Sequence, residues 1–216
     1  LHGWGASAAA AMGALDRRAE ILSRGHALIV PEGVPRAGRS ERDWAVRDGG
    51  THPRDDVAFL RAVLEDAARR GVDRRRVLLT GFSRGGSFVW DVACRAPDLA
   101  AAYAPVAGTF WEPLPETCAG PVDLLHVHGW TDRVVPIEGR AIGGGRIVQG
   151  DLFAALARLR VANRCSARQP ETASHGAGLW WRRWTGCAGG RIDVAFHPGG
   201  HAAPEGWTAR MLDWFD

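Results

Sequence analysis

The chain has 216 residues, 46% of them hydrophobic, and a formal net charge of +3. This length and composition predict a single globular domain over residues 1–216, and no apolar run is long enough for a transmembrane helix. The basic side chains are all arginines, because the sequence contains no lysine, and they are scattered along the chain. We therefore expect neither a nucleic acid nor a membrane as a partner.

Short apolar runs alternate with segments of helical spacing along the chain. The segments that predict helices are 7–23, 55–70, 87–95, 151–161 and 207–215. The runs that predict strands are 26–31, 77–80, 99–106, 122–127, 179–185 and 191–196. Such alternation is typical of an α/β fold with a mostly parallel, doubly wound sheet and helices on both faces. Because Leu1-His2-Gly3 resembles a strand end and the loop after it, we expect that N-terminal strands are missing.

One seven-residue stretch, Thr80 to Gly86, has the pattern of a nucleophile elbow. In it, Gly81-Phe82-Ser83-Arg84-Gly85 places a serine between a predicted strand and a predicted helix. A nucleophilic serine has to stand clear of its backbone on such a turn, and glycines avoid clashes across it. The backbone N–H of Arg84 would lie at a helix N-terminus, where it can stabilise an oxyanion. The alternative is an ordinary glycine-rich turn, because glycine occupies 28 of the 216 positions.

A serine hydroxyl becomes a good nucleophile only with a histidine base and a carboxylate that orients the histidine. Asp132 follows the strand predicted at 122–127, and His201 follows the one at 191–196. The order serine, acid, histidine is that of α/β-hydrolases. His197 competes with His201, but the glycines beside His201 allow its loop to turn inward. Asp132 could also be a turn residue that holds only its own loop.

Two further segments that contain histidine are candidates for a functional role. The loop His2-Gly3-Trp4-Gly5 follows the strand end at Leu1, so the backbone N–H of Trp4 is a candidate second oxyanion donor, although H-G-x-G also suits an ordinary turn. His126 and His128 share one strand face and could suggest a metal pair. Because no nearby acidic or cysteine ligand has matching geometry, we interpret both as packing residues and expect no metal and no cofactor.

The four cysteines, Cys94, Cys118, Cys165 and Cys187, are dispersed and form no C-x-x-C pair. This spacing argues against a zinc knuckle or a thioredoxin-type site. Of the three pairings into two disulfides, Cys94–Cys118 with Cys165–Cys187 is preferred because each bridge closes a short segment, and buried free thiols are the alternative. Disulfides would indicate a secreted or periplasmic protein.

Ten tryptophans accompany a single tyrosine. Several follow predicted strand ends, and three of them are candidate substrate-binding residues: Trp111, Trp130 and Trp207. Tryptophan often only fills a protein core, which is the alternative. At strand ends, these side chains could wall a cleft suited to aromatic or sugar rings.

Several motifs together resemble one branch of a known superfamily. They are LHGWG at 1–5, DRRRVLLTGFSRGG at 73–86, APVAG at 104–108, HVHG at 126–129 with Asp132 and Val135-Pro136, GGH at 199–201, and NRC at 163–165 with WTGC at 184–187. The chain resembles the secreted polyhydroxybutyrate depolymerases and the feruloyl or acetylxylan esterases among the α/β-hydrolases. The resemblance implies that fold, with Ser83 as nucleophile, Asp132 as acid and His201 as base. It also implies an oxyanion hole from the N–H groups of Trp4 and Arg84, and a late disulfide hairpin at 163–187.

The same resemblance implies a secreted serine carboxylesterase that works through an acyl-enzyme. Its substrates would be polyesters such as polyhydroxyalkanoate, or feruloyl and acetyl esters of plant polysaccharide. Two alternatives stay open: a prolyl oligopeptidase-type serine peptidase, which usually carries a propeller domain, and a catalytically silent hydrolase fold used for binding. The oligomeric state is not predicted by any motif.

Overall fold

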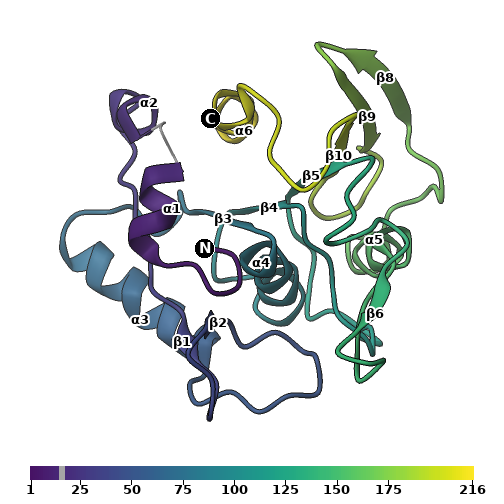
Figure 1. Cartoon of the computed structure of the whole chain (residues 1–216). Helices are drawn as coiled ribbons and strands as arrows, with labels where there is room; N and C mark the ends of the chain where they lie inside the picture. The colour runs from purple at the N-terminus through teal and green to yellow at the C-terminus, as the bar shows by residue number, and fades with distance from the viewer. Residues whose placement is uncertain (15–17) are drawn as a thin grey trace.

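The computed structural model describes residues 1–14 and 18–216, and a six-stranded sheet forms its centre (Figure 1). The strands lie in the order β3-β4-β5-β10-β9-β8. Their bounds are β3 Leu78–Phe82, β4 Ala102–Val106, β5 Leu124–Gly129, β10 Ile192–His197, β9 Leu179–Trp184 and β8 Thr172–Gly176. The first four run parallel, and β9 and β8 add to them antiparallel. The predicted mostly parallel sheet is confirmed.

The helices are α1 Ala8–Ala14, α2 Arg18–Ser23, α3 Asp56–Arg69, α4 Arg84–Arg95, α5 Leu152–Ala162 and α6 Trp207–Phe215. Four of the predicted helices match α3 to α6, whereas the one expected over 7–23 includes residues 15–17, which lie outside the described residues. Two starts are fixed by side-chain caps. Asp55 accepts hydrogen bonds from the N–H groups of Val57 and Ala58, and Asp151 accepts one from Ala154.

The sheet is covered on both faces. Figure 1 shows α4 and α5 on one side of it and α6 on the other. The larger core cluster combines α3, α4 and α5 with the sheet, including Leu60, Trp90 and Leu156. The smaller one packs Trp207 and Met211 of α6 against the opposite face. Because strand side chains alternate between faces, Phe196 joins the first cluster and its neighbour Ala195 the second.

The strand expected at 26–31 does not form, so that prediction is wrong. These residues are alternately exposed and half-buried and have no ladder partner. The end strand β3 is instead met by Leu1, whose carbonyl accepts a hydrogen bond from the Phe82 N–H at 3.1 Å. An apolar run forms a strand only where a neighbouring strand satisfies its backbone groups. Beside β3 that position is occupied by Leu1.

Elements without a clear sequence signal are short or exposed. They are the pair β1 Val34–Pro35 and β2 Arg42–Asp43, the hairpin β6 Arg140–Ile142 and β7 Ile147–Gln149, and the exposed edge strand β8. Gly143-Gly144-Gly145 forms the turn of that hairpin, with positive φ at all three residues. Both preferred disulfides, Cys94–Cys118 and Cys165–Cys187, are present. Within the described residues, no helix combines the length and apolar character that a bilayer span requires.

Candidate active site

Ser83 stands on a sharp turn between β3 and α4. Its φ is 56° and its ψ is −119°, a conformation that L-residues rarely adopt. The turn is closed by contacts that only glycine allows: a Cβ on Gly85 would lie 2.5 Å from the His2 carbonyl oxygen, and one on Gly108 would lie 2.6 Å from the Ser83 carbonyl oxygen. The G-x-S-x-G segment therefore has the geometry of a nucleophile elbow.

Asp132 and His201 meet at the same edge of the sheet, where parallel strands β5 and β10 end. His201 Nδ1 lies 2.7 Å from Asp132 Oδ2. The other carboxylate oxygen, Oδ1, accepts hydrogen bonds from the backbone N–H groups of Val134 and Val135. Burial opposes ionisation of Asp132, but hydrogen bonds from His128 and His201 outweigh it and hold the pKa of this carboxyl well below its ordinary value. Asp132 is thus an ionised, fixed acceptor for the imidazole.

The loop after β10 is pressed onto the end of β5, which brings His201 to Asp132. The Trp130 N–H donates to the His197 carbonyl at 2.7 Å, and a Cβ on Gly129 would lie 2.0 Å from the Gly200 carbonyl oxygen. His197, the competing candidate, bonds within its own loop: its Nε2 lies 3.0 Å from the Ala202 carbonyl oxygen and its Nδ1 accepts from the Gly199 N–H. The geometry thus favours His201 as the partner of the acid.

The residue before the serine contacts His201. The Phe82 and His201 rings have centroids 4.8 Å apart, and Phe82 directly precedes Ser83. Among residues 1–14 and 18–216 the structure records no hydrogen bond between Ser83 Oγ and His201 Nε2. Such contacts are often long in ligand-free enzymes and shorten when substrate binds.

The glycine-rich loop at 2–5 lies beside the serine. A Cβ on Gly3 would be 3.5 Å from Ser83 Cβ, so the N–H of Trp4 is close to the nucleophile. His2 holds the loop: its Nε2 accepts from the Gly33 N–H at 2.9 Å, and its carbonyl accepts from Trp44 Nε1 at 2.9 Å. In the described chain, no residue accepts a hydrogen bond from the N–H of Trp4 or Arg84, so both can meet an oxyanion.

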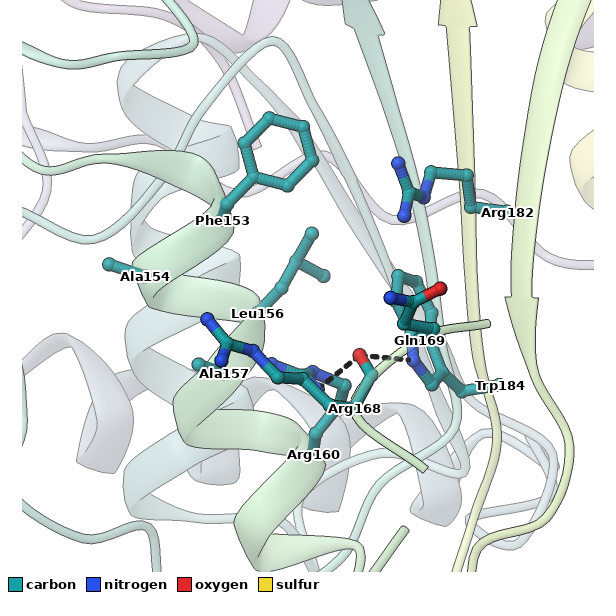
Figure 2. Close-up of a pocket in the computed structure, with 9 residues that line it drawn as sticks. All are labelled: Phe153, Ala154, Leu156, Ala157, Arg160, Arg168, Gln169, Arg182 and Trp184. Atoms are coloured by element: carbon teal, nitrogen blue, oxygen red, sulfur yellow. Dashed lines mark hydrogen bonds between the residues drawn. The ribbon is translucent and has the colours of Figure 1, made fainter. Parts of the chain in front are cut away.

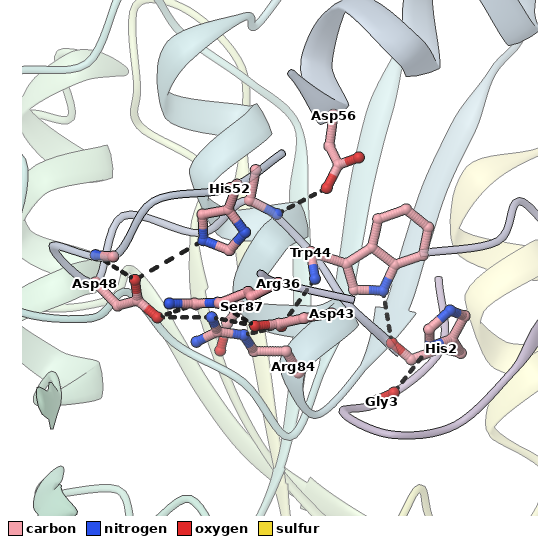
Figure 3. A network of polar contacts seen from close by, with 12 residues as sticks. His2, Gly3, Arg36, Asp43, Trp44, Asp48, His52, Asp56, Arg84 and Ser87 are labelled. Carbon is pink, nitrogen blue, oxygen red and sulfur yellow. Dashed lines mark hydrogen bonds and ion pairs between the residues drawn. The ribbon is translucent and has the colours of Figure 1, made fainter. Parts of the chain in front are cut away.

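The Arg84 side chain points away from this hole into a buried ion-pair network (Figure 3). It bonds both oxygens of Asp43, at 2.6 and 3.0 Å, and Asp48 Oδ2 at 2.6 Å. Arg36 bonds the same two carboxylates from the other side. Burial opposes ionisation of Asp48, but His52, Arg36 and Arg84 lower the pKa of this carboxyl far below its ordinary value. The network ties the loop around residues 36–48 to the first residue of α4.

His126 and His128 form a buried pair behind the acid. His128 donates from Nε2 to the Val135 carbonyl at 2.7 Å, which leaves its Nδ1 to accept from His126 Nε2 at 3.0 Å. His128 Nε2 also lies 3.4 Å from Asp132 Oδ2. Burial lowers the pKa of His126 well below its ordinary value, so this ring is neutral. In the described part of the chain, no group of three or more His, Cys, Asp or Glu side chains is arranged to hold a metal ion.

Two of the three tryptophans predicted to bind substrate belong to the core, which corrects that prediction. Trp207 is 2% exposed and stacks on Trp181, and Trp111 is 7% exposed beneath the Arg84 guanidinium. A ring buried by its own chain offers no surface to a ligand. Trp130, in contrast, is 60% exposed and Trp4 is 58% exposed, and both neighbour the site.

Sequence reasoning missed the residues that hold the site. Asp43 ends the two-residue strand β2, and Arg36 and Asp48 lie in irregular segments on either side of it. The packing role predicted for His128 did not include its contact with Asp132. The only signal was the concentration of Arg and Asp in the loop before α3, which does not say which charges meet.

The sequence of the chain is similar to those of proteins named as esterases. No protein-family model matches the chain. Over 197 residues it is 28% identical to "Probable feruloyl esterase C" of Aspergillus niger, which covers 87% of this chain and 62% of that protein. Over 125 residues it is 32% identical to feruloyl esterase C of Emericella nidulans, which covers 56% of this chain and 41% of that protein. The chain thus spans about half the length of these relatives.

A solved structure is similar over nearly the whole chain. The acetyl xylan esterase from Aspergillus awamori superimposes with a TM-score of 0.68 at 14% identity, covering 99% of this chain and 86% of that one. This likeness concerns the fold, and it agrees with the mostly parallel sheet described above. The chain therefore has the α/β-hydrolase fold, and its sequence is similar to the feruloyl esterases of that superfamily.

Proposed function

We propose that the chain is a serine carboxylesterase with Ser83 as nucleophile, His201 as base and Asp132 as the acid that orients it. The observation that carries this proposal is the 2.7 Å contact between His201 and Asp132 at the sheet edge where Ser83 occupies its strained turn. The relatives named as feruloyl esterases support ester hydrolysis as the reaction. An ionised Asp132 fixes the proton on His201 Nδ1, so Nε2 is available as the base.

The reaction has two halves. Ser83 Oγ attacks the ester carbonyl carbon while His201 Nε2 takes the hydroxyl proton, and the N–H groups of Trp4 and Arg84 stabilise the oxyanion. The carbon–oxygen bond to the alcohol then breaks, and His201 returns the proton to the leaving oxygen. Water repeats the sequence on the acyl-serine, which releases the carboxylic acid and restores Ser83.

The substrate class we favour is feruloyl or acetyl esters of plant polysaccharide, with polyesters as the second choice. Exposed Trp4 and Trp130 beside the site suit an aromatic acyl group or a sugar ring. Two disulfides support a secreted or periplasmic location, because such bonds persist in oxidising compartments.

A fluorophosphonate probe tests the nucleophile directly. We expect it to label Ser83, as located by peptide mass spectrometry, and to leave a Ser83→Ala variant unlabelled. Asp132→Asn should lower kcat for p-nitrophenyl acetate on the order of 10⁴-fold through loss of the oriented tautomer, while Asp213→Asn, an exposed carboxylate on α6, should not. An unlabelled but folded chain would favour the binding-only alternative, and faster cleavage of peptide amides than of esters would favour the peptidase.

A further inference from the structure

A second cavity lies on the flank of the sheet, between α5 and β9 (Figure 2). Its volume is about 700 Å³, within the range of small-molecule sites. Phe153, Leu156 and Arg160 line it from the helix, Arg182 and Trp184 from the strand, and Arg168 and Gln169 from the loop between them. None of these residues belongs to the proposed catalytic group.

The cavity is lined by three arginines, and none of the described residues that line it is acidic. In the described chain, none of the guanidinium groups of Arg160, Arg168 and Arg182 has a carboxylate oxygen within 4.0 Å. Two of them instead face Trp184, with guanidinium carbons 5.7 Å (Arg160) and 5.9 Å (Arg182) from its ring centroid. About half of the other described arginines have an acidic partner, and what distinguishes these three is that they surround one space together.

Arg160 is held in place and incompletely satisfied. Its NH1 donates to the Arg168 carbonyl, which also accepts from Trp184 Nε1, as the dashed lines in Figure 2 show. Its Nε is buried and has no hydrogen-bond partner. Burial and the nearby charges of Arg168 and Arg182 lower the pKa of Arg160. The three neighbouring guanidinium groups repel one another, and an anion in the cavity would relieve that repulsion.

We propose that this cavity binds a carboxylate carried by a ring-sized body, either a sugar acid or an aromatic acid. The guanidinium groups supply paired donors for the two carboxylate oxygens. The exposed Phe153 ring supplies an apolar wall for a ring, and the Gln169 amide can bind hydroxyl groups. A carboxylate fits the planar pair of donors on an arginine guanidinium group. A ring attached to that carboxylate fits within the volume of the cavity.

The cavity is connected to the proposed active site by a row of aromatic rings. Phe153 at its rim lies 5.9 Å from Phe196, and Phe196 lies 5.8 Å from Trp130, two residues before Asp132. Phe153 and Trp130 are both exposed, so one extended ligand could contact both. The binding proposal does not depend on esterase activity, because its test measures binding alone.

Isothermal titration with matched ligand pairs tests the proposal on the whole chain. The pairs are trigalacturonate against neutral trigalactose, and benzoate against benzamide, with inorganic phosphate as a third anion. We expect at least one carboxylate to bind about tenfold or more tighter than its neutral partner and than phosphate, and to weaken as salt is raised. The two pairs distinguish a sugar acid from an aromatic acid.

Variants localise the binding. Arg182→Gln, on an exposed strand position, and Arg160→Gln should each weaken carboxylate binding about tenfold, whereas Arg158→Gln, exposed on the same helix and outside the cavity, should not. Unchanged near-ultraviolet circular dichroism shows that each variant is folded. If Arg160→Gln does not fold, Arg182→Gln alone still tests the proposal. Equal binding of acid and neutral partner, equal binding of phosphate, or full binding by folded Arg182→Gln would overturn the proposal.

Discussion

Two groups of arginines in this molecule face opposite situations. Below the nucleophile elbow, Arg84 and Arg36 are neutralised by Asp43 and Asp48, and every contact is between side chains of the same chain. In the cavity between α5 and β9, Arg160, Arg168 and Arg182 surround a space, and none of the described residues that line it is acidic. Charges that are paired internally hold a loop in place, and charges left unpaired around a cavity are available to a ligand. The same residue type therefore predicts a scaffold in one place and a binding site in the other.

Breaking the paired group should have the largest effect on stability. Asp48→Ala removes one of two carboxylate partners from buried Arg84 and from half-buried Arg36, so we expect the free energy of unfolding to fall by about 3 kcal/mol at pH 7. The pKa of Asp48 is lowered by folding, so this contribution is present above about pH 4 and is lost as the pH falls further. Urea unfolding of the chain and of Asp48→Ala at several pH values measures the loss of stability and its dependence on pH.

The matched control is Asp98→Ala, which removes an exposed pair with Arg61. Solvent screens such pairs, and we expect a loss of about 1 kcal/mol or less. Equal losses in the two variants would show that the buried network is no more important to the fold than a surface pair.

Asp91 is a buried carboxylate that contrasts with Asp43 and Asp48, which pair with arginines. Asp91 on α4 accepts a hydrogen bond from the Arg47 N–H and forms no ion pair with any residue that the structure describes, and burial raises its pKa to about 6. Folding thus favours the protonated form of Asp91. The destabilisation caused by burying its ionised form is therefore absent below about pH 4 and fully present above pH 6. Asp91→Asn should raise the free energy of unfolding by about 2–3 kcal/mol at pH 7 and hardly change it at pH 3.5. A gain of the same size at both pH values would contradict this assignment.

Removing one unpaired arginine should have the smallest effect. We expect Arg182→Gln to change the free energy of unfolding by about 0.5 kcal/mol or less, because no carboxylate loses a partner. Thermal unfolding in low salt, beside Arg158→Gln, measures this difference. A large loss of stability in Arg182→Gln would mean that this arginine supports the fold in the way that Arg84 does.

The same contrast explains what the sequence could predict. Ser83, Asp132 and His201 follow recognisable strand ends, and chain order plus strand polarity was enough to expect them at one edge. Trp111 and Trp207 also follow strand ends, yet packing against Arg84 and Trp181 buries them, and sequence position does not show this. The run at 26–31 was apolar enough for a strand, but whether a strand forms depends on an available neighbour. Pairing of Arg84 with Asp43 and Asp48 is tertiary, so no local pattern revealed it.

The central claim, ester hydrolysis through Ser83, is tested most directly by one rate comparison. Hydrolysis of p-nitrophenyl acetate and methyl ferulate is measured for the chain and for Ser83→Ala in one buffer without added metal. We expect measurable rates for the chain and a loss on the order of 10⁴-fold or more in the Ser83→Ala variant. Equal rates in both proteins, or no activity in a folded chain, would contradict it.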